Sequence, residues 1–346
     1  MDHLAILRRV APEIIDVIER RYTVLQTIYH LQPIGRRALA SRLEWPERMV
    51  RKEVEFLRSA GLINSASGGM EVAEGGRRIL EGLKEMNREL RGLADLEQEL
   101  ARRLKLRRVI IVPGDSDVDE TVKKEIAVAT ARYLDQTLVD GDVVAVTGGT
   151  TLAEAARSLP NTSSPRKVTV VPARGGLGEE VELQANTVAA NFAQALGGTY
   201  RLLHVPDDLG PEALLTIAEE PKIKEMLELI RSARIVVHGI GSAEEMARRR
   251  GMSTENIEKL RQRDAVGEAF GYYFNLAGEI VYASSSVGLG YEDLGNAEEV
   301  IAVGGGKSKA KAALAVLISH HQDIWITDEG AARAMLEQLE NVPVSV

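Results

Sequence analysis

Residues 143–151 have the sequence VVAVTGGTT, and the chain continues as LAEAA over residues 152–156. The apolar run at the start is typical of a strand that is buried on both faces. Gly148 and Gly149 then form a tight turn before a helical segment, where backbone N–H groups converge at the positive end of the helix dipole. We therefore predict that a phosphate binds here, with Thr150 and Thr151 as further hydroxyl donors. The alternative is an ordinary capped helix, which needs neither the second glycine nor the second threonine.

Similar apolar runs recur after residue 107 and alternate with helical segments. They lie at residues 109–112, 168–171, 202–205, 235–238, 300–303 and 324–327. Val- and Ile-rich strands that alternate with helices predict an α/β domain with a doubly wound parallel sheet, covered on both faces. Residues 271–282 interrupt the alternation and predict an inserted hairpin.

Two further glycine-rich turns follow predicted strands. GGGKSK at residues 304–309 is not an ATP-type P-loop, because that motif needs a glycine where Ile301 stands. GIGSAE at residues 239–244 lacks the third small residue of the dinucleotide fingerprint, so NAD is not expected. Both turns should lie with residues 148–151 at the carboxyl edge of the sheet, where open α/β sheets bind ligands.

Positively charged side chains are expected at the same edge. We favour Lys309 over Lys307 as the lysine that faces the ligand. Arg174 directly follows a predicted strand, and residues 248–250 form an arginine triplet that could provide a second anionic subsite. Solvated lysines and surface arginines are the alternative.

Residues that could catalyse a reaction are sparse. His204 and His238 fall inside predicted strands and are more simply core or edge residues than general bases. Asp264 and Glu268 have the spacing of one helix face, and either could bond a sugar hydroxyl or transfer a proton. The sequence contains no cysteine and no evident metal-ligand or Ser-His-Asp pattern. We predict a binding protein without catalytic residues, metal or cofactor.

The first 76 residues predict a winged helix-turn-helix. Helical spacing of apolar residues indicates helices at residues 14–31 and 35–43 and a third from Pro46 to Gly61, and a Gly/Ser-rich tip then indicates a hairpin. The third helix would present basic residues to a DNA major groove, and the second would contact the phosphate backbone. The candidate DNA-binding residues are Arg36, Arg37, Arg48, Arg51 and Lys52. A solvated basic helix face is the alternative.

Charge and composition agree with this division of the chain. Residues 1–110 carry 21 Lys and Arg against 16 Asp and Glu, whereas the whole chain has a formal net charge of −8. The basic part is therefore the candidate nucleic-acid-binding part. No run approaches the roughly 18 apolar residues that would span a bilayer, and we expect a cytoplasmic protein with no membrane partner.

A leucine-rich stripe between residues 77 and 106 predicts a single helix. We expect it to link a DNA-binding domain at residues 1–76 to an effector domain at residues 107–346. Two copies of the chain could also form a dimer through this leucine stripe, or the stripe could pack against its own chain.

With these motifs in place, the chain resembles the SorC family of sugar-responsive transcription regulators, whose sensor domain is similar to glucosamine-6-phosphate deaminase-type folds. The resemblance rests on PERMVR at residues 46–51, TGGTT at 147–151 and TDEGAA at 327–332. A glycolytic branch of the family is indicated by PARGG at 172–176, DAVGEAFGYYFN at 264–275 and GGKSKA at 305–310.

The resemblance implies a repressor of an operon for lower-glycolysis enzymes, induced by fructose-1,6-bisphosphate. It also implies homodimers or homotetramers on double-stranded operator DNA. One phosphate would contact Gly148, Gly149, Thr150, Thr151 and Lys309. The other would contact Arg174, Gln184 and Arg249, with Glu268 on a sugar hydroxyl. Two alternatives stay open: a SorC-type regulator that answers another sugar phosphate, and a sugar-phosphate isomerase or deaminase with a DNA-binding appendage.

Overall fold

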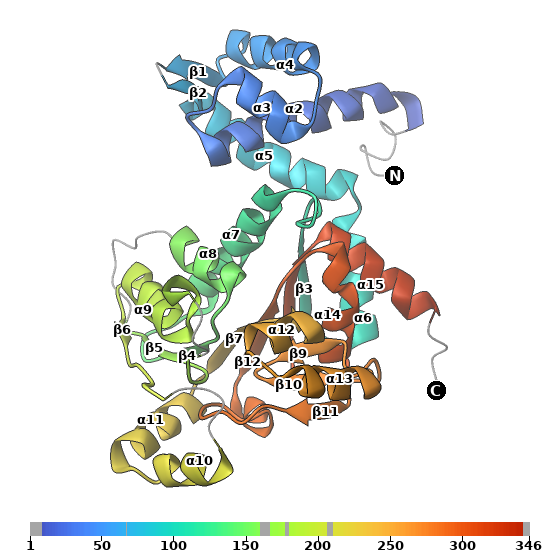
Figure 1. The fold of residues 1–346 in the computed structure, drawn as a ribbon. Helices are drawn as coiled ribbons and strands as arrows, with labels where there is room; N and C mark the ends of the chain where they lie inside the picture. Colours follow the sequence, from blue (N-terminus) through green and yellow to red (C-terminus); the bar gives the residue numbers. More distant parts are fainter. Residues whose placement is uncertain (1–8, 67, 160–166, 177–179, 206–209, 342–346) are drawn as a thin grey trace. The chain divides into compact units, whose positions relative to one another are not determined.

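The computed structural model describes residues 9–66, 68–159, 167–176, 180–205 and 210–341 (Figure 1). It divides into two compact units, Met1–Ala94 and Asp95–Val346. No helix among the described residues is long and apolar enough to cross a membrane.

The first unit is a helical domain with a two-stranded wing. Its elements are α2 (Pro12–Leu31), α3 (Arg36–Leu43), α4 (Glu47–Ser59), β1 (Ile63–Ala66), β2 (Gly69–Val72) and α5 (Glu74–Leu90). β1 and β2 pair antiparallel, with Ile63 opposite Val72. Leu25, Leu39 and Leu57 pack in one core formed by helices and wing. These elements confirm the predicted winged helix-turn-helix.

The prediction of a single helix over residues 77–106 is wrong. α5 ends at Leu90, and a second helix, α6 (Leu93–Leu104), follows it. Gly92 adopts a left-handed φ of +63°, which ends a helix because the hydrogen-bond ladder cannot continue through it. Leu100 and Leu104 are buried within the chain itself, which favours the packing alternative for the leucine stripe.

The second unit contains a seven-stranded sheet in which every pair of neighbours is parallel. The order is β3-β13-β12-β7-β4-β5-β6. All residues of β12 and β13 are buried, so layers cover both faces of the sheet. The strands are β3 (Arg108–Val112), β4 (Val143–Val146), β5 (Thr169–Pro172), β6 (Thr199–Tyr200), β7 (Ile235–Gly239), β12 (Glu299–Val303) and β13 (Ile324–Asp328).

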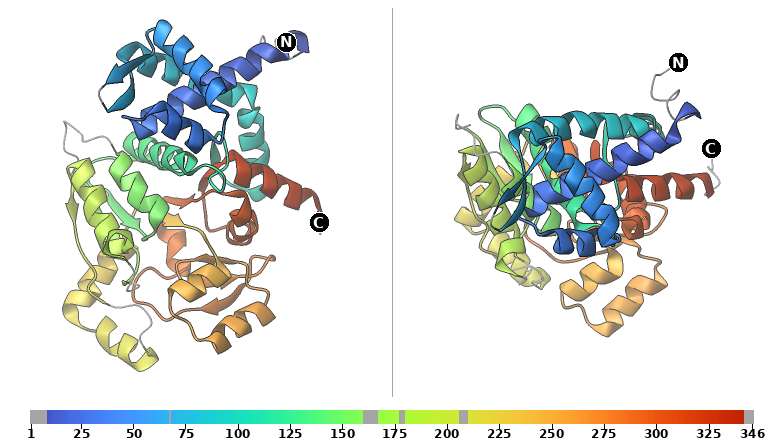
Figure 2. Two further views of the ribbon diagram at one scale, coloured as in Figure 1. Left: turned by 45° about the horizontal axis from the view of Figure 1, so that its top comes forward. Right: turned by 90° about the horizontal axis from the view of Figure 1, so that it is seen from above.

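Helices pack on this sheet, as Figure 2 shows from two further sides. α7, α8 and α9 lie side by side. The helices are α7 (Glu120–Thr137), α8 (Thr150–Ser158), α9 (Ala185–Leu196), α10 (Pro211–Ala218), α11 (Pro221–Arg231), α14 (Ala310–Leu317) and α15 (Glu329–Asn341), with short 3₁₀ turns η1 (Val181–Leu183), η2 (Glu292–Asn296) and η3 (Lys307–Lys309). The doubly wound prediction is confirmed.

The direction of winding reverses between β4 and β7. From β4 the chain proceeds through β5 to β6 at one edge, whereas from β7 it proceeds through β12 to β13 in the other direction. The connections on either side leave the sheet on opposite faces at such a switch point, which opens a crevice at the carboxyl ends of the two strands.

The strand predicted at residues 202–205 is wrong, because the edge strand β6 ends at Tyr200. The backbone of Leu203 instead bonds to a side chain: its N–H donates to Asn186 Oδ1 and its carbonyl accepts from Asn186 Nδ2, both at 3.0 Å. His204 is exposed and lies outside any strand.

A smaller antiparallel sheet follows β7, with order β11-β10-β9-β8. Its elements are β8 (Gly241–Ser242), α12 (Ala243–Arg249), α13 (Thr254–Gln262), β9 (Gly267–Ala269), β10 (Tyr272–Phe274) and β11 (Ile280–Ala283). β10 and β11 form the predicted hairpin. The prediction that Asp264 and Glu268 share a helix face is wrong, because α13 ends at Gln262 and Val266 N–H already bonds to the Phe274 carbonyl, which draws the chain into the sheet.

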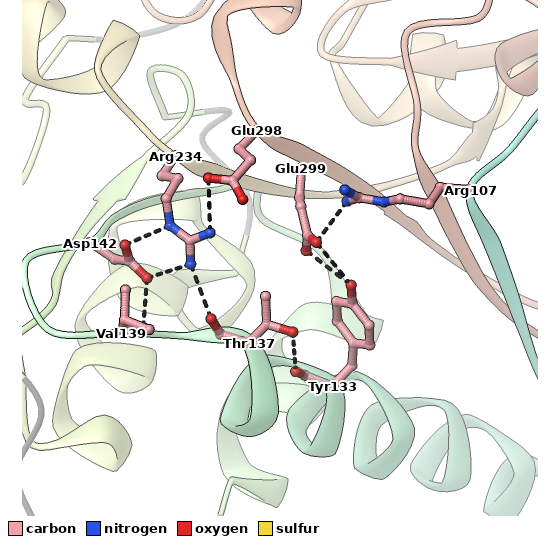
Figure 3. Close-up of polar contacts among 8 residues, drawn as sticks. All are labelled: Arg107, Tyr133, Thr137, Val139, Asp142, Arg234, Glu298 and Glu299. Atoms are coloured by element: carbon pink, nitrogen blue, oxygen red, sulfur yellow. Dashed lines mark hydrogen bonds and ion pairs between the residues drawn. The ribbon is translucent and has the colours of Figure 1, made fainter.

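Polar side chains tie the strands together at the opposite, amino edge of the parallel sheet (Figure 3). Arg234 precedes β7 and donates to both carboxylate oxygens of Asp142, which precedes β4, at 2.6 and 2.7 Å. Glu299, at the start of β12, accepts from Tyr133 Oη at 3.0 Å and pairs with Arg107 at 2.7 Å. These contacts join the start of β4 to the start of the neighbouring β7, and the start of β12 to α7 and to the segment before β3.

Candidate ligand-binding site

A pocket lies at the carboxyl edge of the parallel sheet, where β4 and β7 meet. The turns after β4, β5, β7 and β12 line it, and the small sheet with α12 supplies another wall. The pocket brings together all the predicted effector-binding residues: Gly148, Gly149, Thr150, Thr151, Arg174, Gln184, Arg249, Glu268 and Lys309. Lys307 and Asp264 are exposed and do not line it.

The turn after β4 needs its two glycines for different reasons. A Cβ on Gly148 would lie 2.3 Å from the Leu183 carbonyl oxygen, so only glycine permits this approach. Gly149 has a φ of +118°, which L side chains rarely adopt. Thr150 and Thr151 begin α8, and the first-turn N–H groups of a helix have no acceptor within the helix. Gly149 N–H donates to the Leu183 carbonyl at 2.9 Å, so the donors that the turn offers to the pocket are the first-turn N–H groups of α8 and the hydroxyls of Thr150 and Thr151.

The turn at residues 304–309 differs, because carboxylates of the same chain cap its amides. Gly306 N–H donates to Asp328 at 2.7 Å, Ser308 N–H to Asp117 at 2.7 Å and Lys307 N–H to Asp115 at 3.3 Å. These donors are satisfied internally. What the turn contributes to the pocket is the Lys309 side chain beside Gly304 and Gly305.

Three arginines also line the pocket. Arg174, just after β5, is only 5% exposed, and its Nη2 donates to Ser284 Oγ at 3.3 Å. Arg249 ends α12. The next residue, Arg250, also lines the pocket and forms a buried ion pair with Glu268 at 2.8 Å.

The sequence indicated the arginine triplet at residues 248–250 as a possible subsite, but only Arg249 was assigned to the ligand and Arg250 was not. Successive residues at the end of a helix point about 100° apart, and the triplet indeed separates: Arg248 pairs with Glu244 at the surface, whereas Arg250 turns inward. Asp117, Lys123 and Phe270 also line the pocket and were not predicted. The sequence around Asp117 carries no recognisable ligand motif.

His238 is a core residue, as predicted. It is fully buried in β7, and its ring packs on Phe270 with centroids 4.5 Å apart. Burial lowers its pKa to about 4 and outweighs a hydrogen bond with the Gly239 carbonyl, which acts in the opposite direction. The ring is therefore neutral near pH 7 and packs behind the pocket wall.

In the first unit, α4 has two distinct faces. Val50, Val54 and Leu57 are buried in the core, and the opposite face exposes the predicted residues Arg48, Arg51 and Lys52. On α3, Arg37 is exposed, whereas the partly exposed Arg36 pairs with Glu47 at 3.2 Å, at the first turn of α4.

Comparisons with known proteins cover both units. A family model described as "Putative sugar-binding domain" matches residues 88–337, and the model of the CggR N-terminal DNA binding domain matches residues 17–87. The crystal structure of a SorC family transcriptional regulator from Enterococcus faecalis is 40% identical, with a TM-score of 0.66 over 70% of this chain and 99% of that chain. The chain belongs to the SorC family.

Full-length relatives agree with this assignment. The central glycolytic genes regulator of Priestia megaterium is 46% identical over 334 residues, which cover 96% of this chain and 98% of that protein. The regulator of the same name from Bacillus subtilis is 43% identical over 95% of this chain and 97% of that protein. The structure of the full-length sorbitol operon regulator SorC from Klebsiella pneumoniae, at 20% identity, has the same fold, with a TM-score of 0.68 over 92% of this chain and 98% of that chain.

This SorC-family protein is thus a sugar-responsive transcriptional regulator with a DNA-binding domain and a sugar-binding domain. Its close relatives are regulators, and the isomerase or deaminase alternative is excluded.

Proposed function

We propose that this regulator represses an operon of glycolytic genes and that fructose-1,6-bisphosphate is its inducer. The observation that carries the proposal is the positive charge of the pocket wall, which combines the glycine–threonine turn at residues 148–151 with Lys309 and three arginines, Arg174, Arg249 and Arg250. A ligand with two phosphates can use both cationic groups, whereas a monophosphate leaves one of them unused. The names of the relatives, central glycolytic genes regulator, support the glycolytic operon.

The proposed contacts divide the lining residues between two phosphates. Gly148, Gly149, Thr150, Thr151 and Lys309 would bind one phosphate. Arg174, Gln184 and Arg249 would bind the other, with Glu268 beside the sugar. No metal or cofactor takes part in the proposal.

On the DNA side, α4 would enter the major groove. Arg48, Arg51 and Lys52 would contact bases or phosphates there, and Arg36 and Arg37 would contact the backbone. Homodimers or homotetramers would bind an approximately palindromic operator in the cytoplasm. The inducer would act by population shift, favouring an arrangement of subunits whose recognition helices no longer match the half-site spacing.

Fluorescence anisotropy tests the proposal directly. The full chain is bound to its own upstream promoter DNA at fixed salt and titrated with fructose-1,6-bisphosphate and a panel of sugar monophosphates. Weakened binding with the bisphosphate alone is the expected result. A response only to a monophosphate would replace the inducer and keep the family assignment, whereas a response to no sugar phosphate would overturn the proposal.

A further inference from the structure

The turn Phe270–Gly271 between β9 and β10 lies against two arginines that line the pocket. Arg174 follows β5 of the parallel sheet, and Arg250 follows α12. These arginines are 76 positions apart in the sequence, and the turn is a neighbour common to both.

Glu268 links Arg250 to this turn. Its side chain is only 5% exposed, and one oxygen, Oε1, accepts from Arg250 Nη2 at 2.8 Å and from Gly271 N–H at 2.5 Å. Glu268 itself is fixed by strand register, opposite Tyr273 on one side and Gly241 on the other. A single carboxylate oxygen therefore sets the position of the Arg250 guanidinium relative to the turn.

Ser284 and close packing link Arg174 to the same turn. Ser284 Oγ accepts from Arg174 Nη2 at 3.3 Å and donates to the Gly271 carbonyl at 3.1 Å. A Cβ on Gly271 would lie 2.1 Å from Arg174 Nη1, so the guanidinium is pressed against the glycine backbone. Both arginines are thus held through the groups around Gly271.

The charges of the three arginines and Glu268 match one phosphate. Arg174, Arg249 and Arg250 together with Glu268 sum to about +2, and a phosphomonoester carries about −1.5 to −2 near pH 7. Buried guanidinium groups held by fixed partners are suited to bidentate phosphate recognition, because little side-chain freedom remains to be lost on binding.

We propose that Glu268 is a positioning residue: it holds Arg250 directly and Arg174 through the Gly271 turn, both for the second phosphate, and so sets the preference for a bisphosphate over a monophosphate. The inference rests on the proposed function of the pocket. It gives Glu268 a role toward the arginines that is separate from any contact with a sugar hydroxyl.

Titration calorimetry of the full chain with fructose-1,6-bisphosphate and with fructose 6-phosphate tests this role. In Glu268→Ala and Arg250→Met, the affinity for the bisphosphate should fall by about 10- to 100-fold, the effect of losing charge-assisted hydrogen bonds. In Arg250→Met the affinity for the monophosphate, seated on the turn at residues 148–151, should change little. In Glu268→Ala it should fall much less than the affinity for the bisphosphate, because Glu268 also lies beside the sugar of both ligands. Glu268→Gln keeps an acceptor for both donors and should retain the preference.

Ser284→Ala is a milder second variant, in case Glu268→Ala does not fold. It should lower the preference for the bisphosphate by roughly 3- to 10-fold, as expected for a long hydrogen bond from a guanidinium to a neutral hydroxyl. Thermal unfolding of every variant checks that the domain stays folded.

The outcomes separate the two proposals. If the unaltered protein shows no preference for the bisphosphate, the proposed function fails before any variant is measured. If it shows the preference and Glu268→Ala keeps it, the positioning role is wrong. Equal losses of affinity for the two ligands would indicate a merely structural role for Glu268. If Glu268→Gln behaves like Glu268→Ala, the charge of Glu268 alone matters. Either result overturns the inference.

Discussion

Lys309 and Thr151 are the side chains that distinguish the turn at residues 148–151 from an ordinary helix start. We predict that Lys309→Ala combined with Thr151→Ala abolishes the ligand response and leaves DNA affinity intact, because the loss of a cation and a hydroxyl donor costs about 10- to 100-fold in phosphate binding. The measurement is operator-DNA anisotropy with and without fructose-1,6-bisphosphate. Lys307→Ala is the matched control, since Lys307 is exposed and does not line the pocket. Intact induction in the double variant would refute this placement of the phosphate.

Gly271 provides a second test at single-residue scale. Its φ is +81°, and an added Cβ would collide with Arg174 and Ser284. We predict that Gly271→Ala displaces Arg174 and lowers the affinity for fructose-1,6-bisphosphate by about tenfold or more in calorimetry. Gly141→Ala is the control, because Gly141 also has a positive φ, of +95°, but no neighbour within 4 Å. Equal effects of the two substitutions would attribute the loss to backbone strain alone.

At this scale the sequence located the pocket well, because residues at the carboxyl ends of parallel strands must meet once the strands are recognised. Gly148, Arg174 and Lys309 were found in this way. Within the triplet at residues 248–250, Arg249 was assigned to the ligand and Arg250 was not, because the direction of a side chain at a helix end depends on where the helix stops. The carboxylates that cap residues 306–308 were also missed, since Asp115 and Asp328 belong to distant segments whose approach no local pattern encodes.

Among the elements, α4 carries the proposed contact with DNA. We predict that Arg51→Ala and Lys52→Ala together weaken operator binding and reduce the slope of log affinity against log salt by about one for each DNA phosphate that is no longer neutralised. Anisotropy at several salt concentrations measures this slope. Arg78→Ala, an exposed charge on α5, is the control and should leave both quantities nearly unchanged. An unaltered slope in the double variant would remove these residues from the DNA interface.

The network at the amino edge of the sheet should stabilise the second unit. Arg234→Met leaves the buried Asp142 without its bidentate partner, and we expect a loss of about 2–3 kcal/mol in the free energy of unfolding, below the value for a fully buried pair because Arg234 is a quarter exposed. Denaturant unfolding measures the loss. No loss would mean that the network is neutral to stability.

The same pair predicts a pH dependence. Burial opposes ionisation of Asp142, but hydrogen bonds from Arg234 and from Val139 N–H outweigh it and lower the pKa below its ordinary value of 3.8. Because the folded-state pKa is the lower one, the stabilisation is complete above the ordinary value and is lost as the pH falls through the lowered value. Asp142→Asn should flatten this part of the stability curve between about pH 5 and pH 2, and an unchanged acid limb would contradict the assignment.

Helices and strands were predicted correctly where one sequence pattern dominated. The predictions were wrong where a local contact overrode the pattern. The alternation of strands and helices predicted the parallel sheet correctly, and the hairpin at residues 271–282 followed from its composition. Gly92 divided the helix expected over residues 77–106, because one left-handed residue outweighs a continuous leucine stripe. At residues 202–205, the Asn186 side chain satisfied the backbone in place of a neighbouring strand.

For the molecule as a whole, the two units have separate hydrophobic cores. We predict that a fragment beginning at Leu93, the first residue of α6, folds and binds fructose-1,6-bisphosphate with the affinity of the full chain while losing operator binding. Circular dichroism, calorimetry and anisotropy measure the three properties. A folded fragment that binds the bisphosphate much more weakly would show that the first unit contributes to the site.

The parallel sheet keeps its ion-pair network at one edge and its pocket at the other. Substitutions that change ligand binding at the carboxyl ends of the strands therefore leave the contacts of Asp142, Arg234 and Glu299 unchanged. The folding stability that these contacts provide at the amino ends is kept while the pocket residues change. A scaffold divided in this way can evolve new effector specificity by exchanging a few turn residues, without first having to rebuild what keeps it folded.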